Sequence, residues 1–431
     1  MLTTESLHAK FVECSSIGTD TRSVQPGSLF FALKGPNFNA NAFAAEALAK
    51  GAKYVVVDDP AVIQNERFLF VPDVLHSLQE LARYHRRLFD IPVIGITGSN
   101  GKTTTKELVQ AVLTSDRKTL ATSGNLNNHI GVPLTLLCLN TEHRIAIIEM
   151  GANKRGDIAE LAAIAEPTFG LITNIGKAHL EGFGDYDGVV RTKTELYQAV
   201  VLRKGVLFVN ADDPLLMEKS NGTDRRTYGS TPWADTTGMQ RGQDTFLSIM
   251  FQGRGNRDHV ARTRLVGAYN LPNALAAIAI GQYFGVPDAR IAKALSDYQP
   301  GNNRSQFSDT GRNQLIQDAY NANPTSMAAA LENFATIVSD RPKVAILGDM
   351  LELGTETEKE HARIMELIGR LGMEARFVGP AFALAASGSR YRSYANAQEL
   401  YAALMDEPLR DKLILLKGSR GIKLETLLPS L

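Results

Sequence analysis

The chain has 431 residues, about three times the length of a typical domain, so several hydrophobic cores can form without disulfides or structural metals. It carries 46 basic and 46 acidic residues, which argues against nucleic acid as the main partner, because binding to phosphate backbones usually requires a basic excess. The first residues lack the pattern of a signal peptide and no apolar stretch reaches the ~20 residues of a membrane span, so we predict a cytoplasmic protein.

Short apolar runs alternate with helical periodicity along most of the chain, which is typical of parallel α/β architecture. In the first block, this pattern predicts strands at Leu29–Leu33 and Lys53–Val57, and helices at about Phe43–Lys50 and Val74–Leu88. Pro92 then blocks continuation of the helix and precedes a β-branched strand, which indicates a domain boundary.

The second block contains buried-looking strands and one polar region. The predicted strands are Val93–Thr97, Ile145–Glu149, Gly170–Thr173 and Val206–Asn210. Residues from about Asn221 to Val266 are polar and rich in Gly and Thr, so we predict loops and antiparallel strands there, before a helix at Asn273–Tyr283. Cys138 lies in an apolar run and is predicted to be a buried core thiol. Cys14 and Cys138 are the only two cysteines of the sequence, too few for a disulfide framework.

The third block repeats the α/β rhythm after Pro300–Asn303, a predicted linker and hinge. Its predicted strands are Leu315–Ala319, Val344–Gly348, Arg376–Val378 and Leu413–Lys417. We therefore expect three α/β domains, covering residues 1–90, 91–301 and 302–431.

The most specific motif is a glycine-rich turn between the strand Val93–Thr97 and a helix predicted to start at about Lys102. Backbone N–H groups of such a turn and of the helix N-terminus bind anions. Lys102 can neutralise nucleotide phosphates and the Thr103 hydroxyl can bind Mg²⁺. The strict P-loop pattern is not met, because Ile96 stands where it requires glycine, and an ordinary glycine turn is the alternative. The predicted phosphate-binding residues are Gly98, Ser99, Asn100, Gly101, Lys102, Thr103 and Thr104.

Three other side chains can support this loop. Glu149 ends a buried strand, where a carboxylate can hold Mg²⁺ or can simply emerge into solvent. His179 follows another apolar strand and is either a metal ligand or a structural hydrogen-bonding residue. Lys193 lies on a predicted helix, where a lysine usually faces solvent, so the pattern alone does not distinguish it from an ordinary surface lysine.

Taken together, these motifs resemble the Mur ligase superfamily, whose members use ATP to join an amino acid or peptide to a UDP-muramoyl precursor of the bacterial cell wall. The resemblance extends nearly end to end. Beyond the phosphate loop it rests on Asp20–Gly35, Gly124–Leu134, Glu149–Asn153, Asp318–Pro324, Gly348–Gly354 and Lys417–Arg420. The stretch Asp318–Pro324 discriminates most, because ligases of this superfamily that add other amino acids differ there, and the Asp-Asn-Pro-Arg motif of one of them is absent.

The resemblance implies a fold and an activity. It implies a central P-loop-type ATPase domain with a mostly parallel sheet, between a small N-terminal α/β domain and a C-terminal Rossmann-like α/β domain. It implies addition of D-alanyl-D-alanine to UDP-N-acetylmuramoyl-tripeptide through an acyl phosphate, the last cytoplasmic step of precursor synthesis, with ATP and Mg²⁺. We expect a monomer, although the sequence does not determine the oligomeric state. No side-chain nucleophile is required, in agreement with the lack of a clear Ser/His/Asp or Cys/His signature.

The resemblance also implies roles for individual residues. Lys102, Glu149, His179 and Lys193 would be catalytic, and the last three, with Thr103, would bind Mg²⁺. Lys193 matches a lysine that CO₂ converts to a carbamate, an anion that can orient Mg²⁺ instead of repelling it.

The remaining implied residues contact nucleotide or substrate. Asn270 and Asn273 lie where adenine is held, and Arg304 and Asp318 lie where the third domain meets the nucleotide. Substrate-binding residues implied in the same way are Thr21, Arg22, Asn127, Asn128, Tyr320, Asn321 and Asn323.

One segment departs from the family pattern. Many relatives have Asp-Gly-His after the Lys34-Gly35 segment, whereas this chain has Asn39-Ala40-Asn41, so the contacts of this loop to the UDP group stay open. The sequence also leaves open whether the third residue of the tripeptide is lysine or diaminopimelate.

Other functions agree less well with the sequence. Another ligase of the superfamily or a folylpolyglutamate synthetase would not explain Asp318–Pro324. A nucleotide-binding switch or assembly protein would leave the third block without a function. A dehydrogenase is disfavoured because no strand is followed by Gly-x-Gly-x-x-Gly.

Overall fold

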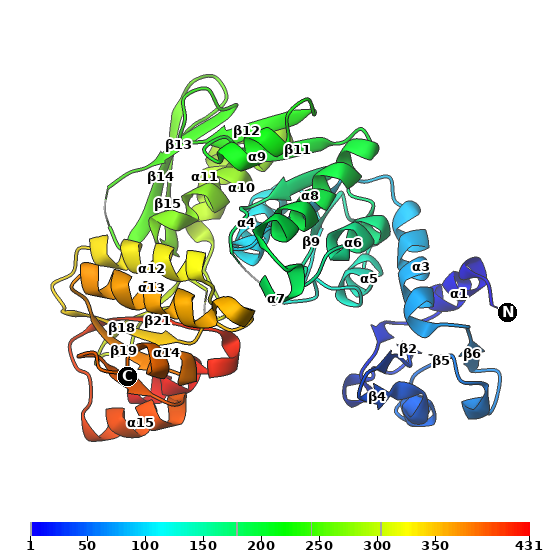
Figure 1. The fold of residues 1–431 in the computed structure, drawn as a ribbon. Helices are drawn as coiled ribbons and strands as arrows, with labels where there is room; N and C mark the ends of the chain where they lie inside the picture. Colours follow the sequence, from blue (N-terminus) through cyan, green and yellow to red (C-terminus); the bar gives the residue numbers. More distant parts are fainter. Residues whose placement is uncertain (1, 178–179, 243, 302–303) are drawn as a thin grey trace.

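The computed structural model describes residues 2–177, 180–242, 244–301 and 304–431. It contains three separate α/β units, each built on its own sheet, in the order in which the sequence predicts them. The nine-stranded sheet lies between the small N-terminal sheet and the six-stranded C-terminal sheet (Figure 1).

The N-terminal unit has a parallel sheet with the order β1-β2-β5-β6. Its elements are α1 (Thr4–Val12), β1 (Ile17–Gly18), β2 (Leu29–Phe31), β3 (Lys34–Gly35), β4 (Phe38–Asn39), α2 (Ala44–Ala49), β5 (Tyr54–Val57), β6 (Phe68–Phe70) and α3 (Val74–Arg87). Asp73 caps α3 by accepting a hydrogen bond from the His76 amide at 2.8 Å. The apolar face of α3 then packs against α1, α5 and α6, which joins this unit to the next.

The central unit has the strand order β15-β14-β13-β12-β11-β10-β7-β9-β8. Its strands are β7 (Val93–Thr97), β8 (Thr119–Ala121), β9 (Ile145–Glu149), β10 (Phe169–Ile172), β11 (Val206–Asn210), β12 (Arg225–Gly229), β13 (Thr236–Gln240), β14 (Phe246–Gln252) and β15 (Asp258–Val266). Its helices are α4 (Lys102–Thr114), α5 (Gly131–Leu136), α6 (Asp157–Ala165), α7 (Leu180–Phe183), α8 (Tyr186–Leu202), α9 (Pro214–Lys219), α10 (Leu271–Tyr283) and α11 (Asp288–Asp297). Strands β7, β9 and β11 are buried along their whole length, as expected where helices cover both faces of a parallel sheet.

The C-terminal unit has the strand order β16-β17-β21-β18-β19-β20, parallel except for β16. Its elements are β16 (Gln306–Asp309), β17 (Gln314–Asp318), α12 (Pro324–Thr336), β18 (Lys343–Gly348), α13 (Thr357–Arg370), β19 (Glu374–Val378), α14 (Pro380–Ala385), β20 (Arg392–Tyr394), α15 (Ala397–Asp406) and β21 (Leu413–Lys417). Two apolar clusters cover opposite faces of this sheet.

Three sequence predictions were wrong or incomplete. Cys138 is exposed, because it follows the end of α5 on the side that faces solvent and not the core. Strand β12, in the region predicted as loops and antiparallel strands, pairs in parallel with β11 and β13. Five elements of the N-terminal unit, α1, β1, β3, β4 and β6, were not predicted; the four strands are three residues or fewer, too short for a periodic pattern.

Candidate active site

The phosphate loop is the turn of residues 98–101 between β7 and α4, as predicted. Gly98 and Gly101 have φ values of +147° and +78°, a region that side chains disfavour. A Cβ on Gly98 would collide with the Thr173 hydroxyl, and one on Gly101 would lie 2.6 Å from Asn273 Oδ1. Glycine is therefore required at both positions.

Segment 173–176, which follows β10, holds the loop from one side. Asn100 N donates to Asn174 Oδ1 at 3.0 Å, and Asn174 Nδ2 donates back to the Asn100 carbonyl at 3.0 Å. The Ser99 hydroxyl donates to the Gly176 carbonyl at 3.0 Å and accepts from the Gly176 amide at 2.9 Å. Two adjacent parallel strands thus place a preformed turn at the N-terminus of α4, where backbone N–H groups attract an anion.

Lys102 folds back over the loop. Its Nζ donates to the Gly98 carbonyl at 2.7 Å and to the Ser99 carbonyl at 3.2 Å. Burial lowers the pKa of Lys102, the Glu149 carboxylate opposes that shift, and the positive charge of Arg304 adds to it. This ammonium is therefore poorly solvated and well suited to pair with phosphate.

Glu149, at the carboxyl end of β9, is 1% exposed. Its Oε1 accepts hydrogen bonds from Thr103 Oγ1 at 3.1 Å and from Asn127 Nδ2 at 2.8 Å. Its Oε2 is buried and has no hydrogen-bond partner among the described residues. A buried carboxylate oxygen without a donor is an expected ligand for a cation.

Lys193 lies on α8 and is 2% exposed, so it does not face solvent as lysines on helices usually do. Its Nζ lies 5.4 Å from the centroid of the Phe183 ring. Burial lowers the pKa of Lys193 well below its ordinary value, and the charge of Lys102 lowers it further, against smaller opposing effects of Asp157 and Glu195. Burial thus shifts this amine towards its neutral form.

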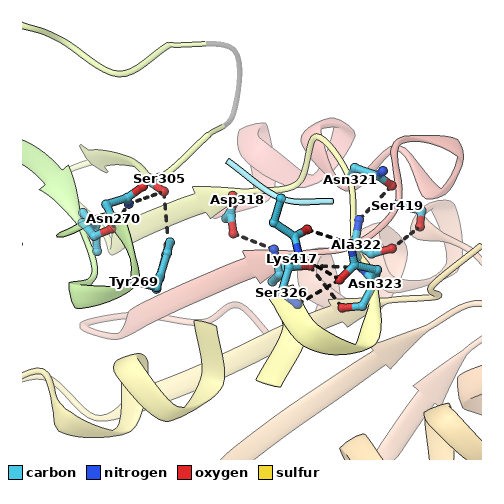
Figure 2. Close-up of polar contacts among 12 residues, drawn as sticks. Tyr269, Asn270, Ser305, Asp318, Asn321, Ala322, Asn323, Ser326, Lys417 and Ser419 are labelled. Carbon is cyan, nitrogen blue, oxygen red and sulfur yellow. Dashed lines mark hydrogen bonds and ion pairs between the residues drawn. The ribbon is translucent and has the colours of Figure 1, made fainter. Parts of the chain in front are cut away.

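The C-terminal unit contributes an ion pair at the carboxyl ends of two adjacent strands. Asp318 ends β17, Lys417 ends β21, and the two residues are paired in register. Lys417 Nζ lies 2.6 Å from Asp318 Oδ2, with Lys417 2% exposed (Figure 2). Nearby, the guanidinium carbon of Arg304 stacks 3.6 Å from the centroid of the Tyr320 ring, and Arg304 Nε is buried without a partner in the described part of the chain.

The stretch Asp318–Pro324 reaches the phosphate loop through Asn323. Asn323 caps α12 with its Oδ1, which accepts from the Ser326 amide at 2.9 Å, and its Nδ2 donates to Asn100 Oδ1 at 2.7 Å. Asn321 Oδ1 accepts from the Ala322 amide at 2.9 Å, so its side chain shapes the same turn (Figure 2).

Asn270 and Asn273 form a buried amide pair behind the loop. Asn270 Nδ2 donates to Ser305 Oγ at 3.1 Å, and Tyr269 Oη lies 3.1 Å from the same hydroxyl (Figure 2). Asn273 Nδ2 donates to Asn270 Oδ1 at 3.0 Å, while Asn273 Oδ1 accepts from Thr105 Oγ1 at 3.1 Å. These bonds connect the start of α10 to α4 and to the start of the C-terminal unit.

A cavity of about 980 Å³ brings most of these groups together, although Gly98, Lys193 and Asn323 are not part of its lining. Its lining contains the rest of the phosphate loop, Glu149, Asn270, Asn273, Arg304, Asp318, Tyr320 and Asn321. Asn127 and Asn128 also line it, although in the structure their side chains serve Glu149 and the N-terminus of α5, respectively. A cavity of this size and polarity suits a nucleotide together with the reacting end of a second substrate.

Not every predicted residue lies at this cavity. Thr21 and Arg22 are in the N-terminal unit, where Arg22 pairs with Asp20 at 2.6 Å and its side chain is 87% exposed. His179, predicted as a metal ligand, lies outside the described residues, as do Asn302 and Asn303 of the predicted hinge.

The departure from the family pattern has a structural role. Asn41 Nδ2 donates to Asp58 Oδ1 at 2.7 Å, and Asn39 Oδ1 accepts from the Asn41 amide at 3.1 Å. Lys34 Nζ lies 2.9 Å from the same Asp58 oxygen. The two asparagines therefore hold the loop and the Lys34 charge in place.

Some lining residues were not assigned from sequence. Lys417 lies in the segment Lys417–Arg420 that carried the resemblance, but no role followed from that segment alone. Tyr269 and Ser305 have no motif of their own, because they reach the cavity only through the packing of β15, α10 and β16.

Comparison with known proteins agrees with this geometry. The profile of the Mur ligase middle domain matches residues 96–281, that of the Mur ligase glutamate ligase domain matches 303–420, and that of the Mur ligase family catalytic domain matches 13–87. The chain belongs to the Mur ligase family. This Mur ligase is 35% identical over 430 residues to UDP-N-acetylmuramoyl-tripeptide–D-alanyl-D-alanine ligase of Bacillus subtilis, covering 96% of this chain and 92% of the relative.

Solved structures share the fold of this Mur ligase. MurF of Acinetobacter baumannii superposes with a TM-score of 0.88 at 32% identity, covering 99% of this chain and 98% of the other. MurF of Thermotoga maritima, solved in complex with ADP, superposes with a TM-score of 0.85 at 24% identity and 97% coverage of both chains. The predicted three-domain α/β architecture is confirmed. No helix within the described residues is long and apolar enough to cross a membrane.

Proposed function

We propose that this Mur ligase uses ATP to add D-alanyl-D-alanine to UDP-N-acetylmuramoyl-tripeptide, the last cytoplasmic step of peptidoglycan precursor synthesis. The names and coverage of the curated relatives support this reaction. One structural observation carries it: the phosphate loop lines the same cavity as Asp318, Tyr320 and Asn321. Asn323, from the same stretch of the C-terminal unit, donates a hydrogen bond to Asn100 of the loop. ATP bound at the loop would face a substrate bound by the C-terminal unit.

The chemistry requires no protein nucleophile. The terminal carboxylate of the tripeptide attacks the γ-phosphorus of ATP, ADP leaves, and an acyl phosphate forms. The amine of D-alanyl-D-alanine then attacks the acyl carbon, loses a proton, and expels inorganic phosphate as the amide forms. Lys102, released from the loop carbonyls, would neutralise the transferring phosphoryl group. The backbone amides of residues 98–101 would bind the other phosphates of ATP. Catalysis would be mainly positioning and electrostatics.

The residues present fit a magnesium ion beside the loop. Within the described residues, Glu149 Oε2 is buried without a donor, and the Thr103 hydroxyl lies 3.1 Å from the other oxygen of the same carboxylate. Both groups are hard oxygen ligands of the kind Mg²⁺ prefers, and His179 is a further proposed ligand. When bound, Mg²⁺ supplies charge neutralisation for the β- and γ-phosphates.

We further propose that Lys193 carries a carbamate. Only a neutral amine attacks CO₂, and burial at this position favours the neutral form. The nitrogen bonds to the CO₂ carbon and loses a proton, so the buried amine becomes an anion. That anion would face Lys102 and the metal as an attractive charge, where the ammonium would repel both.

The domains take one task each in this proposal. Residues 1–90, including Thr21 and Arg22, would bind the UDP end, 91–301 the ATP, and 302–431 the dipeptide. Asn270 and Asn273 would contact adenine, Arg304 and Asp318 would contact the nucleotide from the third domain, and Asn127, Asn128, Tyr320, Asn321 and Asn323 would contact substrate. The enzyme would act as a cytoplasmic monomer that closes about residues 300–303.

A substrate panel tests the reaction. Phosphate release is measured with ATP, Mg²⁺, UDP-N-acetylmuramoyl-tripeptide and D-alanyl-D-alanine, then with each substrate omitted. We expect release to require both, and L-alanyl-L-alanine to replace the D,D-dipeptide poorly. Turnover without the dipeptide, or equal activity with glutamate and a folate acceptor, would contradict the proposal. The same assay, run with tripeptides that carry either lysine or diaminopimelate as the third residue, determines which of the two the enzyme prefers.

A further inference from the structure

A second cavity, of about 450 Å³, lies in the C-terminal unit away from the catalytic cleft. It is lined by residues at the amino ends of β19 and β20, including Arg376, Arg390 and Arg392. The catalytic cleft instead uses the carboxyl ends of β17 and β21, where Asp318 and Lys417 stand. Since β20 is the edge strand on the opposite side of the sheet from β17, the two cavities are separate.

The register of β19 and β20 pairs Arg376 directly with Arg392. Like charges side by side on one face of a sheet repel each other unless a counter-charge joins them. Arg392 has such a partner, because its Nη1 lies 2.5 Å from Glu407 Oε2. Arg376 is 8% exposed, and its Nη1 is buried with no hydrogen-bond partner among the residues described. A buried guanidinium N–H without an acceptor points to a ligand that supplies one.

Two further groups complete the donor set. Arg390 is exposed, and its Nη2 donates to Tyr391 Oη at 3.2 Å, which leaves the phenol hydrogen available as a donor. The Tyr391 ring meets Phe377 edge-on, with centroids 5.7 Å apart, so the core anchors this phenol. The lining contains three arginines and two acidic residues, Glu374 and Glu407, so an anion that enters meets a net positive charge.

We propose that this cavity binds a phosphate group, as inorganic phosphate or as the phosphate of a small phosphorylated metabolite. A carboxylate has two oxygens and one charge, so a single guanidinium satisfies it, as Arg392 does for Glu407. A phosphate has more oxygens and up to two charges, which match the planar forks of several arginines. Arg376 would donate from the buried wall, and Arg390 and Arg392 from the exposed rim. This inference does not depend on the proposed ligase reaction.

Calorimetric titration of the full-length protein with inorganic phosphate tests the site. The Lys102→Ala background removes the lysine of the phosphate loop, so that binding at the second cavity is measured. We expect this background to bind phosphate, and both Arg376→Met and Arg392→Gln to weaken that binding at least tenfold. Arg257→Gln, which removes an exposed arginine near the β14–β15 turn, should leave the affinity unchanged. Arg392 is exposed and its ion pair contributes little to stability, so its variant tests the site even if Arg376→Met does not fold.

Two ligands separate the sources of phosphate. Tighter binding of glycerol 3-phosphate than of inorganic phosphate would support a phosphorylated metabolite, and the reverse order would support free phosphate. Unchanged phosphate affinity in Arg392→Gln would overturn the proposal, as would the absence of binding in the Lys102→Ala background. An acidic peptide that binds at Arg376 and Arg392 where phosphate does not would overturn it too, because the cavity would then be a protein contact.

Discussion

Asn323 Nδ2 donates a 2.7 Å hydrogen bond to Asn100 Oδ1, which joins the cap of α12 to the phosphate loop across 223 positions of sequence. The same side chain caps α12 through Ser326. One residue of the C-terminal unit thus aligns a helix that faces the cavity with the turn proposed to hold ATP. We therefore expect the relative placement of the two proposed substrates to depend on this contact.

Substitutions at Asn323 should separate its two roles. Asn323→Ser keeps a capping hydroxyl but cannot reach Asn100, so we expect little change in melting temperature and a roughly 10- to 100-fold loss of kcat/KM. Asn323→Ala loses the cap as well and should cost a further ~1 kcal/mol of unfolding free energy. Thermal unfolding and product formation are measured on both. Wild-type kcat/KM in Asn323→Ser would show that the bond does not align the substrates.

Lys193→Met should inactivate the enzyme without destabilising it. Methionine fits a buried helix position at no cost of desolvating an amine, so the melting temperature should be equal or higher. Ligation should fall at least ~100-fold, because no anion can form there. Lys293→Met, at a lysine with 75% side-chain exposure, is the matched control and should stay active. Activity of the wild type should also fall in CO₂-depleted buffer and recover with bicarbonate.

Glu149→Gln should raise the Mg²⁺ concentration needed for half-maximal activity by at least ~10-fold. The amide oxygen can still accept from Thr103 and Asn127, so the fold should be retained while the charge is lost. The measurement is the initial rate against Mg²⁺ concentration at saturating ATP. Glu142→Gln, an exposed carboxylate before β9, should leave the curve unchanged.

Lys417→Met should lower the unfolding free energy by about 3 kcal/mol, because it leaves the partly buried Asp318 carboxylate unpaired. The double variant with Asp318→Leu should recover most of this loss, since neither charge remains. Urea unfolding of the two single variants and the double variant gives the coupling energy. Additive losses in the double variant would mean that the two charges do not interact.

Stability should fall as pH drops below about 6.5, the ordinary pKa of histidine. His85 Nε2 lies 3.0 Å from the Leu139 carbonyl, and His85 Nδ1 lies 3.0 Å from His8 Nε2. When both histidines are protonated, neither ring nitrogen of the His8–His85 contact can accept, so this hydrogen bond is lost. Burial lowers the pKa of both histidines, so the unfolded chain binds protons first and acid favours unfolding.

Urea unfolding between about pH 8 and pH 5.5 measures this slope. His85→Gln should make it shallower without abolishing it, because burial also lowers the pKa of His143 and His361. Wild-type stability that rises on acidification would contradict the sign of the effect.

The sequence by itself determined what depends on neighbouring residues. Alternating apolar and helical patterns predicted ten of the twenty-one strands of the described residues, each to within two residues. The spacing of glycines, Lys102 and Thr103 predicted the phosphate loop, because local backbone geometry requires those residue types. The resemblance to Mur ligases came from segments that the comparisons confirm.

Only the tertiary structure decided what depends on burial and on distant partners. Lys193 and Cys138 have unremarkable local sequences, yet packing buries the first and exposes the second. The bond from Asn100 to Asn323 and the adjacent arginines 376 and 392 arise where chain segments far apart meet. Desolvation and pairing set the charge state of such groups, and both are properties of the surroundings in the folded chain.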